Sequence, residues 1–140
     1  MDEHCIFCKI ITSEIPSTKV YEDDSTLAFL DIRPVNLGHT LVIPKEHYRN
    51  ILDVPSDVWS QVTETARKVG IAIKNALGAD GVNISSSHEP AAGQEVFHLH
   101  MHVIPRFKND GLKHWPHREC GPEGEAGMVG KKIREALEER

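Results

Sequence analysis

The stretch FHLHMHVIPR, residues 97–106, constrains this chain more than any other part of the sequence. His98, His100 and His102 occupy every second position, and apolar residues stand between them. Alternation with a period of two predicts a half-buried strand whose same-face side chains lie about 6.5 Å apart. We therefore expect three imidazoles in a row on one face of a strand, anchored by apolar side chains on the other face.

Three interpretations of this histidine row are open from the residues alone. The row can be the polar face of a surface strand, although Thr, Lys or Glu would be the ordinary choice there. It can be a metal centre, because three histidine ligands leave an open catalytic position on zinc. It can also supply a nucleophile, since an imidazole with a pKa near 6.5 is mostly neutral around pH 7.

Composition limits the class of protein to which the chain can belong. Its 140 residues suit one domain, and its net charge of −5 with dispersed basic residues argues against a nucleic-acid partner. No apolar run approaches the roughly 20 residues that span a bilayer, and the acidic N-terminus is unlike a signal peptide. With few cysteines, the chain is expected in a reducing, cytoplasmic setting and away from membranes.

The order of elements indicates an α+β fold with an antiparallel sheet. Apolar residues recur at three- and four-residue spacing over residues 56–77, which predicts a long helix capped by Asp53 or Ser56 and ended by Gly78. A short helix stopped by Pro16 is expected near the N-terminus, and a loop over residues 108–127 precedes a final helix at 130–140. Strands are expected at residues 26–32, 39–44, 81–87 and 95–104.

The chain resembles the histidine triad (HIT) superfamily of nucleotide hydrolases and transferases. Residues 98–104 match its His-apolar-His-apolar-His-apolar-apolar pattern, and residues 21–47 and 91–106 resemble its N-terminal half and catalytic loop. The resemblance implies a HIT-like fold: an antiparallel sheet of about five strands, one long helix and a short N-terminal helix. It places a HIT domain at residues 1–115 and makes residues 116–140 a C-terminal loop and helix of the same domain.

The resemblance also implies catalytic roles. His100 becomes the nucleophile that attacks the α-phosphorus of a nucleotide and forms a covalent nucleotidyl-histidine, which water then cleaves. The backbone carbonyl of the first histidine fixes the tautomer of His100. His102 faces the phosphate and the departing atom, and His39 lies beside them.

A nucleotide pocket is implied in the same way. Asp31 accepts hydrogen bonds from the ribose hydroxyls, apolar side chains wall the base, and the glycine of the phosphate-side loop brings backbone N–H groups to the anion. In the lysyl-adenylate-cleaving branch, Asn and Ser stand where this chain has Ser87 and Glu95, which leaves the preferred leaving group open. The nucleotide-binding set is Ile6, Phe7, Phe29, Asp31, Ile32, Ser87, Gly93, Gln94, His100 and His102.

Two cysteines near the N-terminus, Cys5 and Cys8, have the spacing of a zinc knuckle, but small buried cysteines are an alternative from the residues alone. The segment CIFCKII resembles the zinc-bearing, Hint-like branch of the superfamily. That resemblance supplies His47 and His98 as the remaining ligands of a structural Zn²⁺. Cys120 is expected to be a free thiol.

The function that follows is hydrolysis of a purine nucleoside phosphoramidate or a related AMP-linked substrate. A dinucleoside polyphosphate hydrolase is the nearest alternative, and a nucleotidyl transferase is a more distant one. From another class, the chain can be a non-catalytic purine-nucleotide-binding interaction module. The resemblance further implies a homodimer that pairs through the helix at residues 56–77 and an edge strand.

Overall fold

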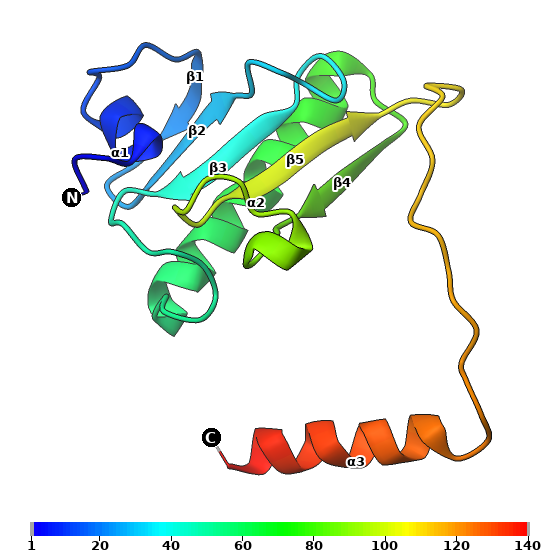
Figure 1. The fold of residues 1–140 in the computed structure, drawn as a ribbon. Helices are drawn as coiled ribbons and strands as arrows, with labels where there is room; N and C mark the ends of the chain where they lie inside the picture. The colour runs from blue at the N-terminus through cyan, green and yellow to red at the C-terminus, as the bar shows by residue number, and fades with distance from the viewer. Residues whose placement is uncertain (1, 140) are drawn as a thin grey trace. The chain divides into compact units, whose positions relative to one another are not determined.

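The computed structural model describes residues 2–139, which divide into two units, one ending at Asp110 and the other starting at Gly111 (Figure 1). The first unit holds the sheet, two α-helices and a short 3₁₀-helix, Pro90–Ala92. The second holds helix α3, Glu125–Glu138, which begins earlier than the predicted residue 130. That residues 116–140 belong to the same domain as residues 1–115 stays a prediction. None of the helices in residues 2–139 combines the length and apolar character needed to span a bilayer.

Within the described residues, five strands form one antiparallel sheet in the order β1-β2-β3-β5-β4, as expected for the α+β class. Leu41 on β3 pairs with Phe29 on β2 and with His102 on β5. Directly opposed residues share a face, so this row places His102 on an otherwise apolar surface. The strands are β1 Lys19–Glu22, β2 Thr26–Leu30, β3 Thr40–Pro44, β4 Gly81–Ser85 and β5 Met101–Arg106.

Helix α2, Ser56–Leu77, has the predicted bounds. It ends at Gly78, whose φ of 65° lies in the left-handed region that a helix C-cap requires. The predicted N-caps are wrong, because the helix starts after Pro55, which offers no capping side chain. The Asp53 carboxylate instead accepts from the backbone N–H groups of Arg49 and Asn50, in the loop before the helix.

The two faces of the sheet carry separate apolar cores, as strand alternation requires. Ala28 and Val42 face helix α2, where they join Val62, Ala66 and other buried residues. The alternate residues of the same strands face helix α1, Ile6–Ile11, and the cysteine segment around it. Since Met101 and Val103 belong to the α2 core, His100 and His102 point to the α1 face.

The predicted strand at residues 95–104 is wrong at its start, because β5 begins only at Met101. Directly before that point, neighbouring side chains that point to opposite sides are both buried: His98 is 0 % exposed and Leu99 is 1 % exposed. The Leu99 N–H donates to the Tyr48 carbonyl, outside the sheet ladder, at 2.7 Å. His98 and His100 are buried and His102 is half-buried, so the row is not a solvent-facing polar face, which removes the surface-strand interpretation.

Two local predictions near the N-terminus are also wrong. Helix α1 ends at Ile11 rather than continuing toward Pro16, because the chain turns at Ser13 with a positive φ of 66°. Strand β1 was not predicted: it has only four residues, and its mostly exposed side chains leave no apolar alternation to detect.

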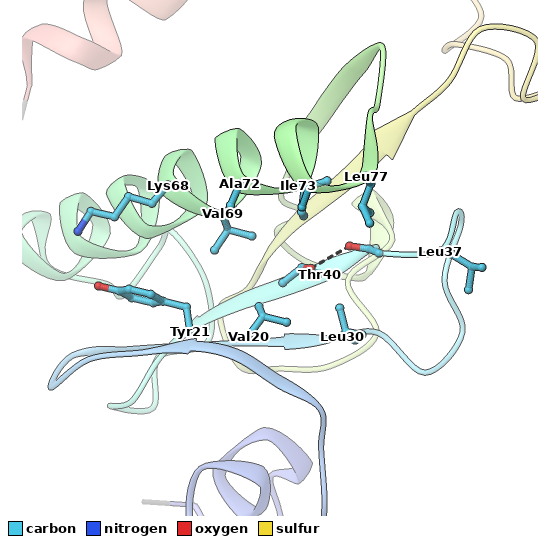
Figure 2. Close-up of a pocket in the computed structure, with 12 residues that line it drawn as sticks. Val20, Tyr21, Leu30, Leu37, Thr40, Lys68, Val69, Ala72, Ile73 and Leu77 are labelled. Carbon is cyan, nitrogen blue, oxygen red and sulfur yellow. Dashed lines mark hydrogen bonds between the residues drawn. The ribbon is translucent and has the colours of Figure 1, made fainter.

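A cavity of about 520 Å³ lies between helix α2 and strands β1 and β2 (Figure 2). Its walls are apolar apart from Tyr21, Lys68 and Thr40, and the Thr40 hydroxyl donates to the Gly38 carbonyl at 2.9 Å. The lining contains neither a histidine nor a carboxylate. The candidate chemistry therefore lies on the other face of the sheet.

Gly38 precedes the candidate residue His39 and has a φ of +100°, beyond the left-handed well that L-residues can visit. A Cβ there would also overlap Leu77 Cδ1, so the Leu77 side chain would have to move. We expect Gly38→Ala to lower the free energy of unfolding by about 2–3 kcal/mol. The matched variant Gly78→Ala, with φ +65° and open space around it, should cost only about 1 kcal/mol. Equal costs in urea unfolding would contradict this account.

Candidate active site

A cavity of about 440 Å³ opens on the α1 face of the sheet. Its walls come from helix α1, strands β2, β3 and β5, and the loop at residues 93–96. The structure brings most of the predicted nucleotide-binding residues into this one cavity: Ile6, Phe7, Phe29, Asp31, Ile32, Gly93, His100 and His102. Ser87 and Gln94 do not line it.

The tautomer of His100 follows from one contact. Its Nδ1 lies 2.7 Å from the backbone carbonyl oxygen of His98, and a carbonyl can only accept. Nδ1 therefore carries the proton, and Nε2 keeps its lone pair. Burial lowers the pKa of His100, and the edge of Phe7 packs against the ring at a centroid distance of 5.2 Å. The arrangement is that of a neutral imidazole with one free nucleophilic nitrogen.

A second chain of hydrogen bonds sets the tautomers of His39 and His102. The Val35 N–H donates to His39 Nδ1 at 3.1 Å, so the proton of the neutral His39 ring lies on Nε2. His39 Nε2 lies 2.9 Å from His102 Nδ1 and donates to it, which leaves the His102 proton on Nε2. Burial lowers the pKa of both rings. His102 thus presents an N–H at the nitrogen away from His39.

A second group of possible metal ligands consists of Asp31, His39 and His102, whose ligand atoms all lie within 4.8 Å of one another. Asp31 Oδ2 is 3.7 Å from His39 Nε2. A metal at this point would need the lone pair of His39 Nε2. That nitrogen holds the ring proton as long as the Val35 N–H occupies Nδ1, so the group fits a hydrogen-bonded relay rather than a metal centre. The interpretation of the histidine row as an open three-histidine metal centre is wrong, because the imidazole of His98 belongs to a different cluster.

That cluster consists of Cys5, Cys8, His47 and His98. Their ligand atoms are separated by 3.4 Å (Cys5 Sγ to His98 Nδ1), 3.4 Å (Cys8 Sγ to His47 Nδ1) and 3.2 Å (between the two Nδ1 atoms). Ideal tetrahedral zinc gives about 3.6 Å for sulfur to nitrogen and about 3.4 Å for nitrogen to nitrogen. The donor set therefore fits a four-coordinate metal site, and Cys120 is a free, exposed thiol outside it.

The orientation of His98 in the cluster is fixed from its other side. Its Nε2 donates to the Pro44 carbonyl at 2.8 Å, which directs the Nδ1 lone pair toward the two thiols. Burial lowers the pKa of His98 to about 4. The same residue therefore contributes its side chain to the cluster and its backbone carbonyl to His100.

Gln94 braces the loop instead of lining the cavity. Its side-chain N–H groups donate to the carbonyls of Arg49 and Val96, and its oxygen accepts from Asn50 and from the Glu89 N–H, so the amide is fully bonded in the protein. This brace holds the backbone that carries Gly93 at the cavity wall.

The structure also reveals cavity groups that the predicted set did not include. Arg33 and Glu95 line the cavity, and the Ser86 hydroxyl donates to the His100 carbonyl at 2.7 Å. The Val35 N–H is the start of the relay. Glu95 stands out in the sequence as an acid beside a predicted phosphate loop, whereas nothing in the sequence marks a backbone N–H four residues before His39.

Comparison with known proteins decides the family. A model of the HIT domain matches residues 12–109. The chain belongs to the HIT family. It is 39% identical over 139 residues to a Saccharomyces cerevisiae protein named adenosine 5'-monophosphoramidase HNT1, covering 98% of this chain and 83% of that one. It is 41% identical over 112 residues to the Arabidopsis thaliana adenylylsulfatase HINT3, covering 80% and 57%.

Solved structures share the fold of this chain. SMU.412c from Streptococcus mutans is 40% identical, with a TM-score of 0.92 over 98% of this chain and 87% of that chain. A Zn-bound histidine triad protein from Mycobacterium smegmatis is 34% identical, with a TM-score of 0.76 over 97% of each chain. The HIT fold expected from the sequence is thus confirmed.

The buried neutral state of His39 should appear in the pH dependence of stability. Because burial lowers its folded pKa, the unfolded chain binds the proton more readily, so stability falls as the pH drops below about 6.5. The variant His39→Asn keeps an acceptor for the Val35 N–H but cannot titrate. Between pH 7.5 and 5.5, the wild type should lose more free energy of unfolding than the variant in urea titrations. Parallel losses would show that His39 is not held neutral.

Proposed function

We propose that this HIT protein hydrolyses AMP phosphoramidates through a covalent nucleotidyl-His100 intermediate. The observation that carries the proposal is the 2.7 Å contact between His100 Nδ1 and the His98 carbonyl, which leaves a nucleophilic Nε2 in a cavity of nucleotide size. The relative named adenosine 5'-monophosphoramidase supports the substrate class.

In the first step, the His100 Nε2 lone pair forms a bond to the α-phosphorus, and the bond from phosphorus to the substrate amine breaks. The departing nitrogen takes one proton from solvent and leaves as the free amine. Water then attacks the phosphorus, the bond to Nε2 breaks, AMP is released, and the proton returns to solvent. The His102 Nε2–H, held by His39, donates to a phosphoryl oxygen and stabilises the charge that develops in both steps.

The remaining cavity residues bind the nucleotide in this proposal. The Asp31 carboxylate accepts from the ribose hydroxyls, and the apolar walls formed by Ile6, Phe7, Phe29 and Ile32 contact the base. Gly93 has a φ of +95°, and its loop brings backbone N–H groups to the phosphate. Gln94 supports that loop, and Ser87 packs near Gly93 without reaching the cavity.

A structural zinc at Cys5, Cys8, His47 and His98 belongs to the same proposal. The ligand separations and the Zn-bound relative support it. Such a metal stabilises the fold and supplies no group to the reaction. It would hold the N-terminal segment against His98, the residue whose carbonyl orients His100.

One alternative has an observation in its favour: the relative named adenylylsulfatase points to sulfate as a leaving group on the same nucleotide. The dinucleoside polyphosphate hydrolase, the transferase and the non-catalytic binding module stay as further alternatives. The homodimer, the cytoplasmic setting and the absence of nucleic-acid and membrane partners stay predictions.

Removing the nucleophile tests the mechanism. His100→Ala should lower turnover of adenosine phosphoramidate by about 10³-fold or more while AMP still binds, because the base and ribose contacts lie elsewhere. His117→Ala, in the exposed C-terminal unit, is the matched control and should keep wild-type turnover. Alkaline rapid quench with radiolabelled substrate should place label on the peptide containing residues 97–106. Turnover by wild type with no labelled protein would overturn the covalent route.

Loss of a thiol tests the zinc. Wild-type protein should contain one zinc per chain by elemental analysis. Cys8→Ser should lose most of that zinc and about 4 kcal/mol or more of unfolding free energy, because an assembled site exists only in the folded chain. Cys120→Ser should retain both, since Cys120 is exposed and outside the cluster. A purified, folded wild type without zinc would contradict the assignment.

A further inference from the structure

The charges around the reacting phosphorus are unusual for a phosphate site. The charged side chains that line the cavity are Asp31, Arg33 and Glu95, two acids and one base. The rings of His39 and His102 are neutral, because each accepts a hydrogen bond at Nδ1. A leaving group with extra negative charge would therefore enter a cavity that has no surplus of cationic side chains to receive it.

Glu95 differs from Asp31 in its position in the cavity and in its hydrogen-bond and ion-pair partners. Asp31 accepts from the Arg33 N–H and lies beside His39, at the end assigned to the ribose. Among residues 2–139, the Glu95 carboxylate takes part in no hydrogen bond or ion pair. The side chain of the buried neighbour Gln94 donates to the Arg49 and Val96 carbonyls. These hydrogen bonds fix the backbone position from which the Glu95 carboxylate extends.

Glu95 also lines a second hollow of about 340 Å³ that shares Ile6, Glu95 and Val96 with the nucleotide cavity. Phe97 contributes an apolar wall there, with the Arg49 guanidinium 4.5 Å over its ring, and Asp2 adds a carboxylate 3.9 Å from His47 Nε2. His4, Cys5 and His47 complete the lining. The shared residues make this hollow a continuation of the cavity past Ile6, Glu95 and Val96, on the side away from Asp31. The Glu95 carboxylate, which stands beside the aliphatic side chains of Ile6 and Val96, suits an alkyl chain that ends in an ammonium group.

We propose that Glu95 selects for a positively charged leaving group, so that AMP phosphoramidates of cationic amines are cleaved in preference to AMP conjugates of anionic leaving groups. This inference rests on the proposed function and deepens it. The leaving amine extends into the second hollow, where its ammonium end lies close to the Glu95 carboxylate. Sulfate and polyphosphate leaving groups, which carry negative charge to the same place, are disfavoured by it.

Three AMP phosphoramidates of matched length test the proposal: those of 1,3-diaminopropane, n-butylamine and 4-aminobutanoate. For wild type, kcat/KM should decrease in that order, by about tenfold from the cationic to the anionic conjugate. This ratio of the two kcat/KM values, the span, should become smaller at high ionic strength. In Glu95→Gln, which keeps size and polarity, the span should fall to about twofold and become insensitive to salt. Glu64→Gln, on the outer surface of helix α2, should retain the wild-type order.

An unchanged order in Glu95→Gln, or a wild-type preference for the anionic conjugate, would overturn the proposal while leaving the hydrolase function in place. A wild type that cleaves none of the three would instead refute the hydrolase. The charge preference can still be measured in that case, as the affinity order of the three conjugates for His100→Ala and for His100→Ala/Glu95→Gln. Equal affinity orders in those two proteins would overturn the role of Glu95.

Discussion

The hydrogen bond between His100 Nδ1 and the His98 carbonyl is the contact on which the rest of the site depends. It exists because the chain at residues 98–100 is buried and held from several directions. The side chain of His98 donates to Pro44, the Leu99 N–H donates to Tyr48, and the Ser86 hydroxyl donates to the His100 carbonyl. Each bond satisfies a group that burial would otherwise leave unpaired, and together they leave His100 Nε2 as the unused nitrogen.

The sequence predicted those features of the fold that depend on local periodicity. Helix α2 was found with its bounds because its apolar stripe repeats over 22 residues and Gly78 terminates it. The start of β5 was not found, because alternation reports which side chains share a face and cannot report that a loop covers the other face. The predicted N-caps of α2 were wrong for a related reason. An Asp carboxylate can accept from N–H groups of a helix or of a nearby loop, and in the structure Asp53 accepts from the loop residues Arg49 and Asn50.

The groups of the candidate site likewise divide into those that a sequence pattern marks and those that it does not. Side chains of the types that bind metals and catalyse reactions carry a sequence pattern, so the histidines, Asp31 and the cysteines could be named in advance, and the structure brings them into two clusters and one cavity. The groups that set the ring tautomers of His39, His98 and His100 are backbone atoms, such as the Val35 N–H for His39, and these have no signature in a sequence. Gln94 lies between the two cases: its position was found, but its partners are backbone carbonyls, one of them that of Arg49 in a loop distant in the sequence.

Burial and hydrogen bonding act together on the imidazoles. A buried imidazolium would be costly, and burial accordingly lowers the pKa of His39, His98, His100 and His102. Hydrogen bonding then decides which nitrogen of each neutral ring keeps the proton: Nδ1 in His100, Nε2 in the other three. One strand-like sequence repeat thus yields three chemically different imidazoles. The difference arises from the partner that each ring meets: the Pro44 carbonyl for His98, the His98 carbonyl for His100 and the His39 ring for His102. A sequence motif alone therefore defines the residues of the triad, and the fold defines their chemistry.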